Sequence, residues 1–261
     1  VLVGGGVIIS NVTFTGDPNQ IGEFNAAGTM PYLGLNNGVI MATGDVALAA
    51  TPNTLGSGGA SLGGGNMGAG DADLDILEGT GVGTNDIAIL EFDFIPTGDS
   101  VKFDFVFGSE EYPEFVNSIN DVFGFFLSGP GIAGPYSNGA INIALIPGTT
   151  QAVSINNVNP GLNAAFYVDN HTSPGVQSVE YDGYTTVLTA IGEVQCGALH
   201  HIKIAIADAS DTGWDSGVFL QAGSFTSNTV VLNSNVDVGG NDSILYEGCG
   251  SALLDFVRND A

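Results

Sequence analysis

Basic side chains are almost absent from this sequence of 261 residues. Lys102, Lys203 and Arg258 are the only three, against 28 acidic residues, so the formal net charge is -25. A surface this negative repels nucleic-acid phosphate and anionic lipid, which excludes DNA and RNA binding. The same acidity suits an extracellular setting that is rich in calcium or salt.

Long apolar runs are also missing. None approaches the ~20 residues that span a membrane, so we expect no membrane insertion. No basic and apolar leader begins at Val1, and we expect a mature or trimmed secreted product. Cysteine is scarce, and the sequence leaves open whether its two cysteines, Cys196 and Cys249, pair.

Glycine and alternating hydrophobic residues dominate instead. Forty glycines are typical of a turn-rich, all-β protein. The segments 89–95 and 101–107 alternate apolar with polar residues, as half-buried strands do. Because Pro96 and Gly98 separate them, we predict that the two segments form an antiparallel hairpin with one buried aromatic face. A third alternating segment, 201–208, carries isoleucine on one face.

Other short strands are predicted along the chain, at 6–14, 38–42, 122–128, 141–146, 185–190 and 217–222. Many short strands of this kind pack as two sheets. The predicted fold is therefore all-β, an antiparallel β-sandwich of the jelly-roll type.

Two stretches interrupt this pattern. In 56–70, eight of fifteen residues are glycine, and we predict a long surface loop. Composition shifts near residue 228, where we place a domain boundary. Residues 229–261 are then a linker with the first strands of an incomplete β module, or an edge-strand extension of the main sandwich.

Acidic residues border two of the predicted strands. Glu110 and Glu111 follow one strand, and Asn120 and Asp121 open the next. Adjacent carboxylates repel one another unless a cation, a proton or hydrogen bonds compensate them. The sequence has almost no basic side chains for this purpose, so a hard divalent cation, calcium above all, is the leading candidate.

A second acidic loop lies between the last two predicted strands. It contains Asp208, Asp211 and Asp215. Carboxylates, backbone carbonyls and water in such a loop make a good oxygen cage for calcium. Trp214, the only tryptophan, lies among them and is either a packed loop anchor or part of a glycan site.

A third acidic group, Asp71, Asp73 and Asp75, has the D-x-D-x-D opening of a calcium loop. It is not an EF-hand, because Ile76 and Val82 stand where that motif needs glycine and a bidentate glutamate. Asp73 remains a candidate carboxylate ligand for an irregular site. The alternative is a solvated acidic loop.

Enzymatic motifs are weak. Residues 59–63 match G-x-S-x-G, but within a glycine-rich loop rather than a strand–helix turn. His200 and His201 face opposite sides of a strand, and zinc-binding spacing is missing from the sequence. Glu110 and Glu111 point apart, unlike the paired carboxyls of a glycosidase. A pair formed by Glu110 with Asp121 or Asp215 is the option left open, and we predict no enzyme.

Longer motifs go beyond composition. They are GSEEYPEFVNSINDVFGFFLSGPG at 108–131, INIALIPGT at 141–149, VSINNVN at 153–159, YDGYTTVLTA at 181–190 and HHIKIAIADASDTGWDSGVFLQAGSF at 200–225. In this order, together with GVIISNVTFTG and DADLDILEG, they resemble the choice-of-anchor L domain over roughly residues 1–228. Trp214 departs from the family, which more usually has a smaller aromatic or aliphatic residue there. The tail YEGCGSALLDFVR resembles the start of a following module.

The resemblance implies a secreted bacterial surface domain without an established catalytic activity. Such domains often stand at the N-terminal end of large adhesin-like proteins, and their C-terminal anchors vary from sorting signals to type IX secretion tails. We therefore expect a non-enzymatic, calcium-stabilised extracellular or cell-surface module that mediates attachment or assembly. Its expected partner is a surface glycan, a protein or copies of itself.

Two alternatives remain for the function. The first is a carbohydrate-binding module that uses Trp214 and calcium-ordered loops. The second is a subunit of an extracellular filament, in which residues 229–261 add a strand to a neighbour. The predicted calcium ligands are Glu110, Glu111, Asn120, Asp121, Asp208, Asp211, Asp215 and Asp73.

Overall fold

The computed structural model describes residues 1–27, 30, 32–49, 53, 70–171 and 179–227, and the backbone of 230–236 and 252–258. Its strands are β1 (Val7–Thr15), β2 (Ile21–Asn25), β3 (Asn37–Ala42), β4 (Thr84–Pro96), β5 (Ser100–Ser109), β6 (Val122–Ser128), β7 (Ile141–Asn142), β8 (Tyr167–Asp169), β9 (Gly183–Thr185), β10 (Leu188–Glu193), β11 (His200–Ala209), β12 (Ser216–Gln221), β13 (Thr226–Ser227), β14 (Val230–Val236) and β15 (Ala252–Arg258). The helix α1 spans Ala72–Glu78, and short 3₁₀ helices lie at Pro18–Gln20, Ser137–Gly139 and Ala164–Phe166.

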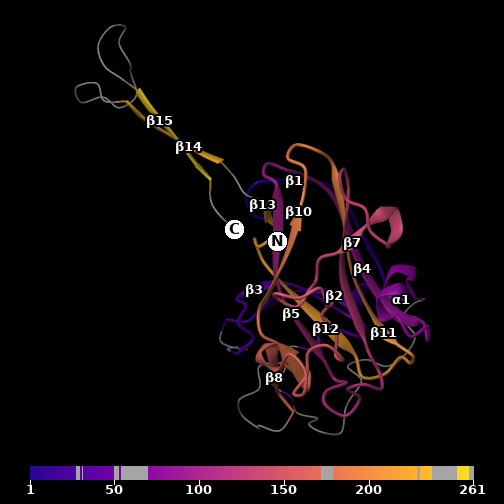
Figure 1. The fold of residues 1–261 in the computed structure, drawn as a ribbon. Helices are drawn as coiled ribbons and strands as arrows, with labels where there is room; N and C mark the ends of the chain where they lie inside the picture. The colour runs from indigo at the N-terminus through magenta and orange to yellow at the C-terminus, as the bar shows by residue number, and fades with distance from the viewer. Residues whose placement is uncertain are drawn as a thin grey trace.

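These strands form two antiparallel sheets that pack face to face (Figure 1). The first sheet has five strands in the order β1-β4-β11-β6-β7. The second has eight, in the order β2-β3-β12-β5-β9-β8, and both β10 and β13 also pair with β5. The predicted all-β sandwich is therefore confirmed.

The predicted hairpin of 89–95 and 101–107 is wrong. Both segments are strands, but β4 belongs to the five-stranded sheet and β5 to the eight-stranded sheet. The connection 97–99 is an arch between the layers. The alternation itself is correct, since the apolar faces of both strands are buried in one core. The aromatic faces are buried equally well whether the two strands pair in one sheet or face each other across the sandwich.

The core between the sheets is mainly aromatic. Phe225, which follows β12, has its ring 5.1 Å from those of Phe92 and Phe94 on β4 and 5.2 Å from that of Phe103 on β5. Phe103 in turn lies 5.4 Å from Phe125 on β6. Contacts at these centroid distances add to the burial of the rings and hold the two layers together.

Two smaller apolar clusters cover the outer faces. One lies on the eight-stranded sheet and includes Phe24, Tyr181 and Phe219. The other lies under α1 and includes Leu74 and Phe126 on the five-stranded sheet. At β6, one face of the five-stranded sheet packs in the central core and the other face packs under α1. This explains why β6 is buried along its whole length.

Several boundaries differ from those predicted. The strand expected at 141–146 ends at residue 142, and the strand expected at 185–190 is divided between β9 and β10. Asp71 caps α1, where we expected a calcium loop or a solvated acidic loop. The predicted loop 56–70 lies outside the described residues except for Gly70.

The C-terminal strands stand apart from the two sheets. β14 and β15 form their own two-stranded antiparallel ribbon, which Figure 1 draws away from the sandwich. The boundary near residue 228 stays a prediction. Cys249 lies outside the described residues, and Cys196 is exposed.

Phe225→Ala is expected to lower the free energy of unfolding by about 3–5 kcal/mol, because it removes the ring that packs against both layers. Chemical denaturation of the full chain measures this change. The control is Leu199→Ala at a side chain that is 57% exposed, where the change should be within about 0.5 kcal/mol. Equal effects of the two substitutions would contradict this account of the core.

Candidate functional site: a buried acidic cluster

Four strand ends bring the sequence-predicted carboxylates together. Glu110 and Glu111 follow β5, and Asp121 immediately precedes β6. Asp208 lies near the end of β11, and Asp215 immediately precedes β12. We call these five residues and Asp211 the acidic cluster.

Pairing of the strands and hydrogen bonds fix this convergence. Ser109 pairs with Ser216 across β5 and β12, and the backbone N–H of Glu110 donates to the carbonyl of Asp215 at 3.1 Å. Asp121 joins the two sheets. It accepts from the N–H of Ala209 in the first sheet at 3.0 Å and from the Ser216 hydroxyl in the second at 2.7 Å.

The carboxylates of the acidic cluster are deeply buried. Glu111, Asp121 and Asp208 are 0% exposed, Glu110 and Asp215 are 1% exposed, and Asp211 is half-buried. Neither carboxylate oxygen of Glu111 or of Asp208 has a hydrogen-bond partner within the described residues. Buried carboxylates without partners are costly unless they are protonated or bind a cation.

Burial and mutual repulsion explain the acid–base properties of Glu111 and Asp121. Burial, together with the charges of Asp121 and Asp211, raises the pKa of Glu111 to about 9. Burial likewise raises the pKa of Asp121 to about 7. The hydrogen bonds from Ala209 and Ser216 oppose this rise, and other carboxylates of the acidic cluster add to it.

Asp208 lies in an equally unfavourable environment for a charged carboxylate. Its pKa is raised well above the usual value by burial first and then by Asp121. The hydroxyl of Thr43 lowers the pKa of Asp208 in part. The Thr43 hydroxyl also donates to two other acceptors, Asp215 Oδ1 and the carbonyl of Ser216, each at 3.4 Å.

Tyr181 is a member of this site that the sequence did not reveal. Its ring lies against Gly108 and Gly217, where an added Cβ would fall 2.9 and 2.2 Å from ring or hydroxyl atoms. The hydroxyl is buried and has no hydrogen-bond partner within the ranges that the structure describes. Burial and the charges of Asp215 and Glu110 raise its pKa. The sequence feature that could have indicated Tyr181 is the pair Gly108 and Gly217, which face each other across β5 and β12. Glycines inside strands often mark a place where another group approaches the backbone closely.

Two other predicted residues lie beside the acidic cluster and make different contacts. The side chain of Asn120 accepts a hydrogen bond from the N–H of Asn156 at 3.1 Å. Trp214 is half-buried, and its ring centroid lies 4.6 Å from that of Phe115. Trp214 is therefore packed as a loop anchor.

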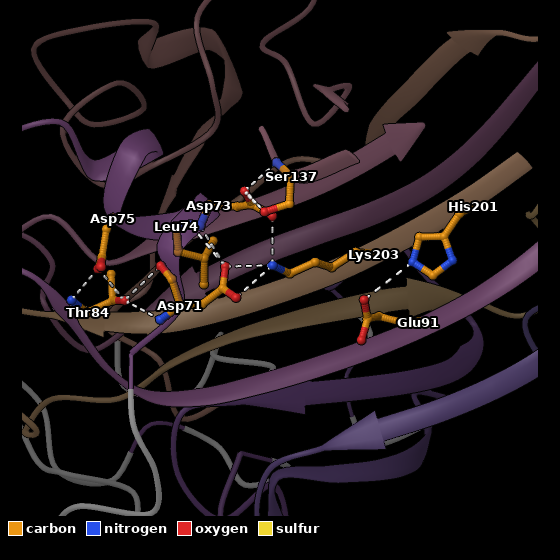
Figure 2. Close-up of polar contacts among 9 residues, drawn as sticks. All are labelled: Asp71, Asp73, Leu74, Asp75, Thr84, Glu91, Ser137, His201 and Lys203. Carbon is orange, nitrogen blue, oxygen red and sulfur yellow. Dashed lines mark hydrogen bonds and ion pairs between the residues drawn. The ribbon is translucent and has the colours of Figure 1, made fainter. Parts of the chain in front are cut away.

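Asp73 has a different environment (Figure 2). It lies in the first turn of α1, on the outer side of the five-stranded sheet, with Lys203 Nζ 2.9 Å from its carboxylate. The N–H and hydroxyl of Ser137 donate to it at 2.7 and 2.8 Å. Although burial opposes the change, these bonds lower the pKa of Asp73. The structure does not place Asp73 with the acidic cluster.

A surface pocket beside α1 is lined by Asp73 and other charged residues. Lys203 lies along it, 2.7 Å from both oxygens of Asp71 and 5.4 Å from the ring centroid of Phe126. His201 contacts Glu91 at the other end of the pocket (Figure 2), with its Nε2 3.3 Å from the Glu91 carboxylate. In this pocket Lys203 supplies a positive charge to Asp71 and Asp73, in contrast to the acidic cluster.

The acidic cluster offers only oxygen donors, namely carboxylates and the hydroxyls of Thr43, Ser216 and Tyr181. Such a donor set suits a hard cation and does not suit zinc or copper. In the described part of the chain, no three His, Cys, Asp or Glu side chains are already arranged around a metal position. Cation binding would therefore require the buried carboxylates to rotate toward one another.

The fold and the site define a β-sandwich domain with a buried cluster of carboxyl groups. Residues 1–226 match the choice-of-anchor L domain, and the chain belongs to that family. Membership indicates a bacterial cell-surface or extracellular module. No curated protein and no solved structure matches the chain.

The described residues contain no helix that is long and apolar enough to cross a membrane.

Without divalent cations, stability is expected to fall as pH rises from about 5 to about 9. The raised pKa values of Glu111 and Asp121 mean that the folded state keeps protons that the unfolded state has lost. Their contribution is full below the unfolded pKa values and is lost as pH rises through the folded ones. Thermal melting in excess chelator measures this trend. A higher melting temperature at alkaline pH would contradict the assignment.

Lys203→Met is expected to lower the free energy of unfolding by about 3–5 kcal/mol, because it leaves the buried carboxylate of Asp73 uncompensated. Denaturant titration measures the change. The matched control is Lys102→Met on the outer side of β5, and a similar loss in both variants would contradict the role of the ion pair.

Proposed function

We propose that this chain is a non-enzymatic module of a bacterial adhesin-like surface protein that binds calcium in its acidic cluster and acts in attachment or assembly. The observation that carries the calcium proposal is the full burial of Glu111 and Asp208, none of whose four carboxylate oxygens has a hydrogen-bond partner among the described residues. A bound calcium ion would supply the missing positive charge and accept oxygens from both sheets.

The charge balance of the chain supports a cation from solution. The side-chain charges that act on Glu111 and Asp208 come from other carboxylates. Lys203, the most promising internal base, is held by Asp71 and Asp73. Calcium tolerates six to eight oxygen ligands in flexible geometry, which suits a site with many carboxylates.

The burial of the acidic cluster also favours a structural role over catalysis. A glycosidase presents its two carboxyls to a sugar ring, whereas here the carboxylates that a substrate would need are 0–1% exposed. The half-buried Trp214 packs on Phe115 rather than forming an open stacking platform, which favours a packing role over glycan binding. We therefore propose that the module contacts its attachment partner through its outer surface rather than through the acidic cluster.

Calcium is expected to raise the melting temperature relative to excess chelator. At free calcium of 100 times its dissociation constant, one site adds about 2.7 kcal/mol, or roughly 5–11 °C for a chain of this size. The increase should be larger near pH 8 than near pH 5, because protons compete for the same oxygens.

Differential scanning calorimetry of the full chain at both pH values makes this comparison. Magnesium serves as the control cation, because it needs a tighter octahedral site and should stabilise less. An unchanged melting temperature in calcium and in chelator would refute calcium binding.

A further inference from the structure

Two neighbouring rows of side chains on the outer face of the five-stranded sheet form the floor of the pocket beside α1. Strand pairing places His201 beside Ser128 in the first row, and Lys203 between Glu91 and Phe126 in the second. Side chains of directly paired residues lie about 5 Å apart on one face of a sheet. The sheet register therefore brings these five side chains together around one space.

The size and lining of this pocket suit a small amphipathic group. Its volume is about 270 Å³, which is below the roughly 300–1,000 Å³ of sites for drug-sized ligands. It therefore fits one side chain or a small molecule. Ile89, Phe126 and Ala140 give the pocket an apolar part, and its other lining residues are polar or charged. A group with a short alkyl stem and a polar end matches this division.

The charges of the lining do not balance. Asp71, Asp73 and Glu91 are acidic and Lys203 is basic, so with neutral histidine the lining carries 1 - 3 = -2. The ammonium group of Lys203 is already engaged by Asp71 at 2.7 Å and Asp73 at 2.9 Å (Figure 2), and its side chain is only 12% exposed. The net charge of the pocket repels an anion and attracts a cation.

Two hydrogen-bonding groups in this pocket are available to a ligand. The side chain of Glu91 is 33% exposed, and its 3.3 Å contact with His201 Nε2 is slightly longer than a usual hydrogen bond. Ser128 is 6% exposed, and among the described residues its hydroxyl makes no hydrogen bond. A buried hydroxyl normally has a partner. A donor on a ligand that enters the pocket would supply one.

We propose that this pocket binds a primary alkylammonium group, as at the end of a lysine side chain on an attachment partner. The ammonium donates to the carboxylate of Glu91 and to the hydroxyl of Ser128, and the alkyl stem packs on Ile89 and Ala140. An ammonium donates three hydrogen bonds and accepts none, which matches a negatively charged site with free acceptors. The inference goes beyond the proposed function and does not depend on calcium in the acidic cluster.

Two other classes of ligand match the pocket less well. A sugar that stacks on an aromatic side chain needs an exposed ring, whereas Phe126 is 1% exposed and Lys203 Nζ lies 5.4 Å from its centroid. A calcium ion needs six to eight oxygens at about 2.3–2.6 Å. No three His, Cys, Asp or Glu side chains within the described ranges are arranged in that way. The longer hydrogen bonds of an ammonium do not require such a cage.

The first experiment follows the amide NMR spectrum of the full chain while a lysine analogue, Nα-acetyl-lysine methylamide, is added. A dissociation constant of about 1–10 mM is expected for a single side chain, with the largest shifts at Glu91, Ser128 and His201. The matched control is the same compound acetylated at Nε, which keeps the stem and loses the charge, and it should not bind. Equal binding of both compounds, or shifts outside this pocket, would overturn the proposal.

The second experiment tests the two assigned groups. Glu91→Gln should weaken binding of the lysine analogue roughly tenfold, and Ser128→Ala roughly two- to tenfold. Ser128→Ala should leave the melting temperature the same or raise it, because the lost hydroxyl has no partner among the described residues. The control is Glu193→Gln at an exposed position on β10, which should bind as the natural sequence does. The amide spectrum of each variant also shows that it is folded, and unchanged affinity in folded Glu91→Gln would refute the site.

A third comparison identifies the source of the ammonium group. A short peptide, acetyl-Gly-Lys-Gly-amide, represents a protein partner, and putrescine represents a free amine. Tighter binding of the peptide supports the lysine of a partner, and tighter binding of putrescine overturns that part of the inference. Glucose that produces the same shifts as the lysine analogue would overturn recognition of an ammonium group. Because these titrations are made in excess chelator, their outcome is separate from that of the calcium proposal.

Discussion

Carboxyl groups are buried at the place where the two sheets of this domain meet. Asp121 precedes a strand of one sheet and accepts a hydrogen bond from Ser216 in the other, so the sandwich cannot close without enclosing its carboxylate. Glu111 and Asp208 are enclosed with it, and the described part of the chain offers neither of them a hydrogen-bond donor. Four strand ends meet at this place, and Tyr181 covers it. The raised pKa values of the site follow from the burial of these carboxyl groups.

Another buried acid, Asp73, is compensated from within the chain. Asp73 receives an ammonium group and two donors from Ser137, which lower its pKa. The two sites are built from the same residue type in the same molecule. The difference is that one contains the internal cation Lys203, whereas the charges that act on Glu111 and Asp208 in the other come from carboxylates. A chain with three basic residues has few further choices.

Sequence reasoning correctly predicted which faces of the strands are buried, because side-chain alternation records burial directly. It also singled out the carboxylates of the acidic cluster, since they border strands that a sandwich brings together. It could not assign the partner of each strand. The segment 97–99 has turn-forming residues that serve a hairpin and an arch between layers equally well, and the alternation of β4 and β5 is the same in both cases.

Two features of the site also escaped sequence reasoning. The spacing of Asp71, Asp73 and Asp75 is shared by calcium loops and by the acidic first turn of a capped helix, and only the position of Lys203 distinguishes them. Tyr181 lies far along the chain from the strands that it covers. The glycine pair Gly108 and Gly217 indicates a close approach, but the identity of the ring depends on the three-dimensional fold.

The arch between β4 and β5 has a consequence for how the chain folds. Because strands that are neighbours in sequence enter opposite sheets, β4 finds its partners in β1 and β11 rather than in the strand that follows it. Such long-range pairing requires large loops to close before stabilising contacts form, and it is slow. Unpaired strand edges are exposed during that time. The high negative charge of the chain then has a kinetic benefit, since it keeps partly folded molecules from associating with one another.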